Sequence, residues 1–343
     1  MRTQPRNNSH GRKFVQLVLS GLLLVALLAS CSSPQQPTRQ LKFSVVTSAD
    51  SSLYKGAAKF AELVLQRTRG RIIVTLYPDA QLAGGNQVKE LEMLSKGQID
   101  FTFHSNLLYS TLDNKFSVIS LPWLFDSYAD VDKFLAGPAG KLLFDAMPPL
   151  GMVGLGYAEN GFRQITNSKR EIKTPDDLQG LKIRVPNAPM YLSLFKSFGA
   201  EPVTMSFAGV YKALEEKAVD GQENPVDLIA SSKLYQVQNY VTLWNYSYDV
   251  MILGVNQELF KSLDQETQDM LRQAAVEACA YEIQVAREAF KTRVDFLKSK
   301  NMKVTELTPA EIAAFRSLTG PVYEEYEPLL GSELMDQVHA LGR

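Results

Sequence analysis

Apolar and polar positions in residues 41–103 repeat with two periods, which predict alternating strands and helices. Residues 41–46 alternate with the period of a half-buried strand, and residues 51–67 carry apolar positions at helical spacing. The pattern then predicts a strand at 72–77, a helix at 86–96 and a strand at 99–103. This β-α-β-α-β order is typical of a parallel sheet covered by helices.

The alternation starts again after residue 150 and predicts a second block. Its expected elements, in chain order, are strand 152–157, strand 181–185, helix 189–198, strand 202–205, helix 207–217 and helix 226–232. Residues 241–255 form a β-rich run that we interpret as one strand crossing between two sheets. The pattern ends with a strand at 302–307, a helix that opens on a capping box at Thr308, and a helix at 332–341.

Residues 264–300 contain neither Pro nor Gly and keep one helical apolar stripe. A helix of this extent measures on the order of 50 Å, so we expect it to brace both blocks. The predicted fold class is therefore α/β, with two lobes and a hinge cleft between them. We expect lobe I to comprise residues 41–162 plus 251–285, and lobe II residues 163–250 plus 286–343.

The N-terminus has the order of a bacterial secretory signal, with cations followed by an apolar run at 17–28. That run is too short for a comfortable transmembrane helix. Leu28-Ala29-Ser30-Cys31 looks like a lipobox, which implies cleavage before Cys31 and a stable anchor of two or three acyl chains. We expect residues 1–30 to be a lipoprotein signal peptide and 31–40 a flexible tether, with a plain signal peptide as the alternative.

Charge and composition narrow the function classes. Loss of residues 1–30 removes four cations and no acid, so the formal net charge of −1 becomes about −5, which argues against nucleic acid as a partner. Of the two cysteines, Cys279 lies in a helical apolar stripe and is expected to be a buried hydrophobe. The three histidines are scattered, so we expect no metal site and no cofactor.

Arg184 is the first candidate binding residue. It is the last position on the polar face of strand 181–185 before Pro186 interrupts the strand, so it lies near a carboxyl strand end, where open α/β sheets place ligands. Its planar guanidinium fits a carboxylate bidentately. The alternative is an ion pair with a structural Asp or Glu.

Two further residues are candidates for the same carboxylate. Arg163 follows the polar segment 159–161 after a predicted strand, and its alternative is a solvated surface cation. Asn224 falls in an acidic turn, where most asparagines bond only their own backbone. We hypothesise that Arg163, Arg184 and Asn224 converge on one carboxylate of a small organic anion.

Other candidates rest on composition or topology. Aromatic residues of lobe II could form a stacking wall, although at this density they are more often core: Phe207, Tyr211, Trp244 and Tyr248. Polar residues stand where the lobe I strand ends should meet the cleft: Asn86, Gln87, Ser105 and Asn106. Enzyme signatures such as Gly-x-Ser-x-Gly, a P-loop or His-Glu-x-x-His are missing, so we expect no catalytic residues.

Three signatures together carry a family resemblance: Asn160-Gly161-Phe162-Arg163, then Gly-Leu-Lys-Ile-Arg-Val-Pro at 180–186, then Ala-Val-Asp-Gly-Gln-Glu-Asn-Pro at 218–225. Their order and spacing resemble the substrate-binding proteins (DctP family) of tripartite ATP-independent periplasmic (TRAP) transporters. The resemblance covers essentially the whole chain after the signal. It implies that Arg184 forms the main salt bridge to a ligand carboxylate, with Arg163, Asn224 and Phe207 as further contacts.

The resemblance also implies a function. We expect an extracytoplasmic receptor in the periplasm or at the cell-envelope surface, anchored through Cys31, that delivers an organic anion to an ion-gradient-driven TRAP permease. The amide-rich wall at 86–87 and 104–106 suits a uronate or aldonate, or the far end of a C4-type dicarboxylate. The alternatives are a sensor read by a signalling partner and an extracytoplasmic lyase, which would need His104 or a cleft carboxylate as its base.

Overall fold

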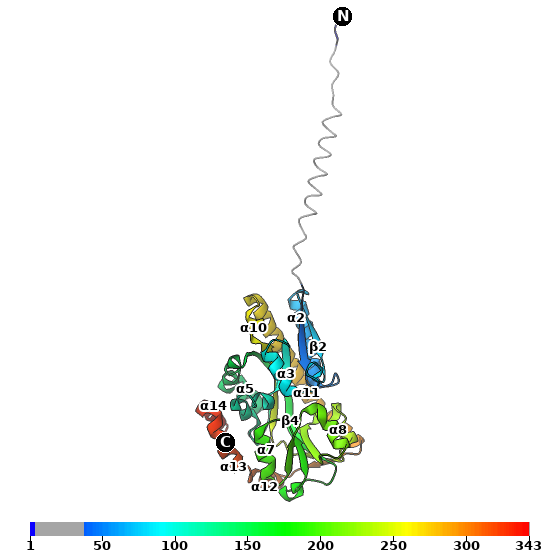
Figure 1. Ribbon diagram of the computed structural model, residues 1–343, viewed down its shortest axis with the longest axis vertical. Helices are drawn as coiled ribbons and strands as arrows, with labels where there is room; N and C mark the ends of the chain where they lie inside the picture. Colours follow the sequence, from blue (N-terminus) through cyan, green and yellow to red (C-terminus); the bar gives the residue numbers. More distant parts are fainter. Residues whose placement is uncertain (4–37, 343) are drawn as a thin grey trace. The chain divides into compact units, whose positions relative to one another are not determined.

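The computed structural model describes residues 1–3 and 38–342 (Figure 1). By their contacts the residues divide into two units, Met1–Arg39 and Gln40–Arg343, and all described helices lie in the second. Cys31, the signal peptide apart from its first three residues, and most of the tether lie outside the described residues.

The first sheet has the order β2-β1-β3-β9-β4. Its strands are β1 (Arg39–Val45), β2 (Ile72–Tyr77), β3 (Phe101–Ser105), β4 (Met152–Asn167) and β9 (Tyr248–Asn256). Strand β1 runs parallel to β3, as the β-α-β pattern predicts, whereas β9 is antiparallel to both of its neighbours. The late strand β9 therefore lies between two strands that come much earlier in the chain.

The second sheet is built on the end of the same strand β4. One side of β4 pairs with β7 (Gly221–Pro225), followed by β5 (Lys182–Val185) and β6 (Glu201–Thr204). The other side pairs with β8 (Tyr240–Leu243), which pairs with β10 (Lys303–Glu306). Both sheets are thus continuous through β4, which is labelled in the middle of the folded unit in Figure 1.

Strand β4 changes partners between Phe162, which faces Tyr248 of β9, and Arg163, which faces Pro225 of β7. Two register shifts along its pairing with β9 are the kind of irregularity that bends a strand. The prediction of one crossing strand at 241–255 is wrong, because β8 and β9 are separate. The chain turns between them at Asn245, whose φ is +47°.

Helices cover both sheets. They are α2 (Ser52–Arg67), α3 (Gln87–Ser95), α4 (Asn106–Tyr109), α5 (Tyr128–Ala136), α6 (Pro138–Asp145), α7 (Pro189–Ser197), α8 (Val210–Glu215), α9 (Val226–Ser231), α10 (Gln257–Lys261), α11 (Gln265–Ser299), α12 (Pro309–Arg316), α13 (Gly320–Leu330) and α14 (Ser332–His339). The helix predicted at 207–217 is a 3₁₀ turn, η6 (Phe207–Gly209), followed by α8. The predicted capping box at Thr308 is confirmed, with Glu311 as its second member.

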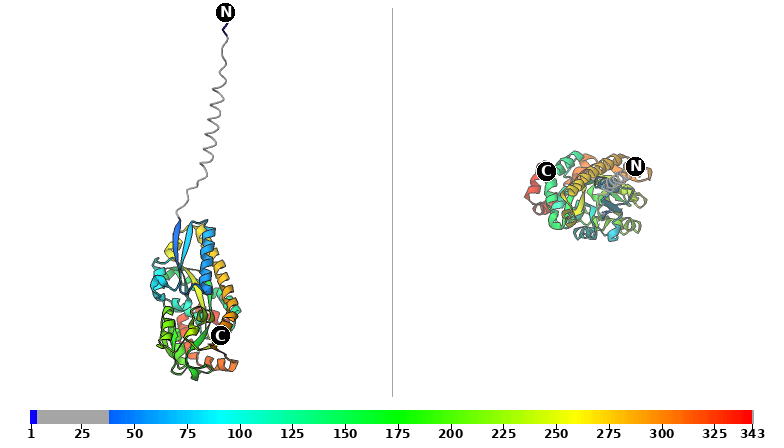
Figure 2. Two further views of the ribbon diagram at one scale, coloured as in Figure 1. Left: turned by 90° about the vertical axis from the view of Figure 1, so that its right-hand side faces the viewer. Right: turned by 90° about the horizontal axis from the view of Figure 1, so that it is seen from above.

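The long bracing helix is confirmed as α11, a helix of 35 residues capped by Asp264. It packs on β4 of the first sheet and on the neighbouring helix α2, and on β10 of the second sheet and helix α9. Helices α2 and α11 run side by side in Figure 2. The contact with α2 is close: a Cβ atom at Gly56 would lie 2.6 Å from Cβ of Glu282. Cys279 is a buried free thiol in the core between α11 and the first sheet, as expected.

Candidate ligand-binding site

A cavity of ≈ 40 Å³ lies among residues of both sheets. Its lining comprises Val46, Thr47, Gln87, Ser105, Leu107, Leu108, Asn160, Arg163, Arg184, Pro186, Phe207, Asn224, Leu228, Asp249 and Met251. Strands β3, β4 and β9 supply residues from the first sheet, and β5 and β7 supply residues from the second. The charged side chains of this lining are two arginines and one aspartate.

Arg184 lies at the next-to-last position of β5 and is 1% exposed. Its Nε donates to the carbonyl oxygen of Met205 at 2.9 Å, and its Nη2 donates to the same oxygen. No carboxylate of the described residues lies within 4.0 Å of its guanidinium nitrogens. Arg184 is therefore a buried cation whose hydrogen-bonded partner in the fold is a neutral carbonyl.

Burial is the largest influence on the Arg184 side chain. It lowers the pKa of Arg184 to about 10, against the raising effect of Glu223 and together with the lowering effect of Arg163. The guanidinium keeps its charge at neutral pH, but the fold destabilises that charge. An anion placed in the cavity would offset this cost.

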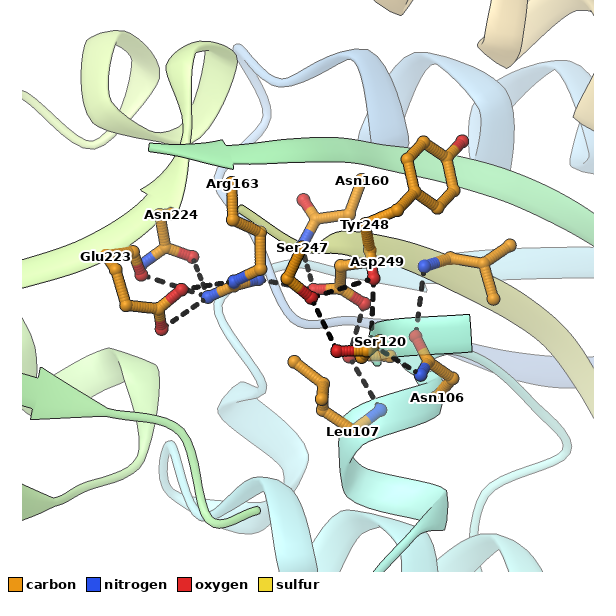
Figure 3. Close-up of polar contacts among 12 residues, drawn as sticks. Asn106, Leu107, Ser120, Asn160, Arg163, Glu223, Asn224, Ser247, Tyr248 and Asp249 are labelled. Atoms are coloured by element: carbon orange, nitrogen blue, oxygen red, sulfur yellow. Dashed lines mark hydrogen bonds and ion pairs between the residues drawn. The ribbon is translucent and has the colours of Figure 1, made fainter. Parts of the chain in front are cut away.

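Arg163 occupies the position where β4 changes sheets (Figure 3). In contrast to Arg184, it is paired with carboxylates of the protein. Its Nε and Nη2 bond the carboxylate of Glu223, Nη2 at 2.8 Å, and its Nη1 bonds the carboxylate of Asp249. Burial alone would lower the pKa of Arg163, but Glu223 and Asp249 more than offset it and hold the pKa well above its ordinary value. Arg163 thus joins β7 to β9, one strand from each sheet.

Glu223 and Asn224 lie in strand β7 rather than in a turn, which corrects the expectation for Asn224. The Asn224 oxygen accepts from Nη2 of Arg163 at 3.1 Å, and its amide nitrogen donates to Gln222 at 2.6 Å. Tyr246 donates to Glu223 at 2.6 Å. Asn224 therefore lines the cavity with most of its hydrogen-bonding capacity already used.

Asp249 and Asn160 line the cavity from the first sheet, and sequence reasoning did not single out either of them. Asp249 accepts from Ser105 Oγ at 2.6 Å, from Asn160 Nδ2 at 2.6 Å and from Arg163. Burial raises the pKa of Asp249, against the lowering effects of these three donors. The sequence did contain a signal, because Asp249 is the single charged residue in the β-rich run 241–255.

Gln87 and Phe207 bridge the two sides of the cavity. The backbone N–H of Phe207 donates to Oε1 of Gln87 at 3.1 Å. The guanidinium carbon of Arg184 lies 6.0 Å from the centroid of the Phe207 ring, within cation–π range. Figure 3 shows the neighbouring polar network that runs from Glu223 through Arg163 to Asp249 and Asn160.

Six of the residues predicted for binding come together in the cavity: Arg184, Arg163, Asn224, Phe207, Gln87 and Ser105. Five other candidates do not belong to its lining: Asn86, Asn106, Tyr211, Trp244 and Tyr248. Asn86 is the N-cap of α3, where its side chain accepts from the N–H of Lys89 at 3.0 Å. Trp244 lies in the aromatic core, its ring centroid 4.7 Å from that of Tyr246, so its placement corrects the expectation of a stacking wall.

None of the helices among residues 1–3 and 38–342 combines the length and apolarity that crossing a membrane requires. Within the same residues, no group of three or more His, Cys, Asp or Glu side chains is placed to hold a metal ion.

The fold and the cavity define a two-lobed α/β solute receptor. The chain belongs to the family described as bacterial extracellular solute-binding protein, family 7, whose profile matches residues 43–329. The resemblance inferred from the three signatures is confirmed. Proteins of this family are transport receptors without catalytic activity, as the missing enzyme motifs predicted.

Relatives agree in sequence and fold. A 2,3-diketo-L-gulonate-binding periplasmic protein of Escherichia coli (strain K12) is 34% identical over 298 residues, which cover 87% of this chain and 90% of that protein. A TRAP periplasmic solute-binding protein from Ralstonia eutropha H16, crystallised with (S)-2-acetolactate, is 38% identical with a TM-score of 0.85, covering 88% of this chain and 98% of its own. The galactonate complex of a sugar-acid-binding protein from Advenella mimigardefordensis is 35% identical with a TM-score of 0.86, covering 90% and 98%.

Proposed function

We propose that this protein binds one carboxylate of a small organic acid at Arg184, between its two lobes, and delivers the ligand to a TRAP permease. The observation that carries the proposal is the Arg184 guanidinium, which lines the cavity and is 1% exposed without a carboxylate partner among the described residues. A ligand carboxylate supplies the direct ion-pair partner that none of the described residues provides.

Geometry and energetics favour a carboxylate over other ligands. The free edge of a guanidinium can bond both oxygens of a carboxylate at once, which adds orientation to affinity. Each charge-assisted hydrogen bond contributes roughly 1.5–3 kcal/mol. Two such bonds account for the difference between millimolar and micromolar binding, since each factor of ten corresponds to about 1.4 kcal/mol.

The other lining residues have supporting roles in this proposal. Arg163 has most of its donors engaged by Glu223 and Asp249, so it orients the site and adds positive potential more than it adds hydrogen bonds. Phe207 packs on the ligand beside Arg184. The amide nitrogen of Gln87 has no hydrogen bond to another of the described residues, so it is available to ligand oxygens from the opposite side.

The ligands of relatives support the chemical class. (S)-2-Acetolactate, galactonate and 2,3-diketo-L-gulonate are all carboxylates that also carry hydroxyl or keto oxygens. Succinate occupies a relative from Shewanella oneidensis at 31% identity. All four ligands contain a carboxylate, and we propose that Arg184 binds this group.

The test is calorimetry of wild type and of Arg184→Ala against these four acids. We expect the variant to lose at least ~100-fold in affinity for any acid that wild type binds, which is about 2.7 kcal/mol. Lys182→Ala is the matched control, because Lys182 is an exposed cation two residues earlier on β5. Unchanged affinity in Arg184→Ala would overturn the proposal.

We also propose that Cys31 is acylated and holds the receptor at a membrane surface. The sequence Leu28-Ala29-Ser30-Cys31 supports this, because small residues directly before a cysteine follow the apolar run. Full-length protein expressed in a bacterial host should partition into the detergent phase, and Cys31→Ser should move it to the aqueous phase. Equal partitioning of both proteins would contradict acylation.

A further inference from the structure

The charged side chains around the cavity sum to zero in the ligand-free protein. Its lining carries two cations, Arg163 and Arg184, and one anion, Asp249, with Glu223 directly behind Arg163. Arg163 is ion-paired with both acids, so these three side chains already hold one positive and two negative charges. Arg184 brings the local sum to zero, and one ligand carboxylate makes it negative.

The bonds around Asp249 indicate that it is ionised. Asn160 Nδ2 and Arg163 Nη1 can only donate, and both bond its Oδ2. Ser105 Oγ accepts the N–H of Leu107 at 3.1 Å, and its own hydrogen goes to Oδ1 of Asp249. Both oxygens of Asp249 therefore act as acceptors, which is the pattern of a carboxylate.

The side of the cavity around Asp249 offers acceptors rather than cations. Asn160 uses its amide nitrogen on Asp249, and its side-chain carbonyl oxygen has no hydrogen bond within residues 38–342. Ser105 retains a lone pair after its two bonds. Hydroxyl groups of a ligand can donate to such acceptors, whereas a carboxylate has no hydrogen to give.

We propose that the cavity selects ligands with a single negative charge and that Asp249 is the residue that rejects a second one. The favoured class is a small monocarboxylate with hydroxyl groups, held by its carboxylate at Arg184 and by its hydroxyls at Asp249, Asn160 and Ser105. A C4-type dicarboxylate would place its second carboxylate against Asp249 with no cation free to neutralise it. This inference rests on the proposed anchoring at Arg184.

Succinate and monomethyl succinate test the inference without any mutation. The two compounds have the same chain length, but the ester carries one charge and succinate carries two at neutral pH. Calorimetry or ligand-induced thermal shift of wild type should show monomethyl succinate binding at least ~10-fold more tightly. Equal binding of the two compounds, tighter binding of succinate, or no binding of the ester would overturn the inference.

Asp249→Asn is the second arm. The amide removes the repulsion and releases charge on Arg163, so succinate affinity should rise at least ~10-fold over wild type. Asp220→Asn is the control, because Asp220 accepts from the backbone N–H of Lys182 outside the cavity and should leave succinate affinity unchanged. No gain for succinate in a folded Asp249→Asn protein would contradict the role of Asp249.

The single variant Arg184→Ala separates this inference from the proposed function. If Arg184→Ala loses affinity for every acid that wild type binds, Arg184 stays the anchor, and a failure in the earlier arms concerns Asp249 alone. Affinity that persists without Arg184 would overturn the proposed function itself.

Discussion

Two buried arginines line one cavity, and the fold treats them differently. Arg163 is 2% exposed and ion-paired with Glu223 and Asp249, whereas Arg184 is 1% exposed and bonds the carbonyl of Met205. Protein carboxylates pair directly with the first cation, whereas direct pairing of the second is left to a ligand. A buried arginine therefore indicates binding only after its partners have been counted, because burial alone is the same for both.

The largest expected effect is on stability and concerns Arg163. Arg163→Met leaves two buried carboxylates without their counter-ion, and breaking a buried pair in this way costs about 3–5 kcal/mol. Urea unfolding of the ligand-free protein should show the loss as a lower transition midpoint with an unchanged slope. A loss of unfolding free energy below about 1 kcal/mol would mean that the ion pairs of Arg163 do not stabilise the fold.

The opposite result is expected for Arg184. Arg184→Met removes a charge that burial destabilises and that no carboxylate of the described residues pairs with directly, so the ligand-free protein should gain about 1–3 kcal/mol. The same urea titrations measure it, with Arg163→Met as the matched variant. Destabilisation of more than about 1 kcal/mol would show that Arg184 has a structural role that its contacts do not reveal.

A buried acid extends the comparison to pH. Glu90 is fully buried on α3, with Ser44 as a hydrogen-bond partner and His104 nearby, and burial raises its pKa from 4.5 to about 7. Because the folded state holds this proton more tightly than the unfolded state, its stabilising contribution is complete below about pH 4.5 and is lost as pH rises through about 7.

As pH rises from 5 to 8, Glu90→Gln should therefore gain about 2–3 kcal/mol of unfolding free energy relative to wild type. Thermal or urea unfolding across that range measures the difference. Glu92→Gln, an exposed position on the same helix, is the control and should follow wild type. A pH-independent difference between Glu90→Gln and wild type would count against a protonated Glu90.

The smallest expected effect tests the bridge across the cavity. Gln87→Ala removes the acceptor of the Phe207 N–H, a contact between α3 and η6 that holds the two sides together. One neutral hydrogen bond contributes about 0.5–1.5 kcal/mol, so ligand affinity should fall about 2–10-fold. Calorimetry of the variant and of wild type measures this fall in affinity. Unchanged affinity would show that the Gln87–Phe207 hydrogen bond does not contribute to ligand binding.

The architecture followed from periodicity wherever one element dominated its segment. The absence of Pro and Gly predicted the 35-residue helix α11, and both ends of β2 were predicted correctly. The crossing strand was misassigned because both 152–167 and 240–256 are long and β-rich. Only the turn at Asn245 and the partner exchange at Arg163 distinguish them, and neither is visible in an apolar pattern.

The site was predictable where a residue type had a specific chemical reason to be there. Arg184 before Pro186 was found through its strand position, and Arg163 and Asn224 through their signatures. The intramolecular ion pairs of Arg163 were not predicted, because its partners Glu223 and Asp249 are 60 and 86 residues away in the sequence. Trp244 and Asn86 were misplaced because an aromatic or amide next to a cleft segment serves a core or a helix cap equally well. The lobe boundaries within residues 41–343 stay a prediction.

The most direct test of the central claim is a crystal structure of the ligand complex. The account predicts a ligand carboxylate with both oxygens about 2.7–2.9 Å from guanidinium nitrogens of Arg184, with Arg163 still paired to Glu223 and Asp249. A carboxylate bound to Arg163 in place of those acids, with Arg184 making no contact, would contradict it.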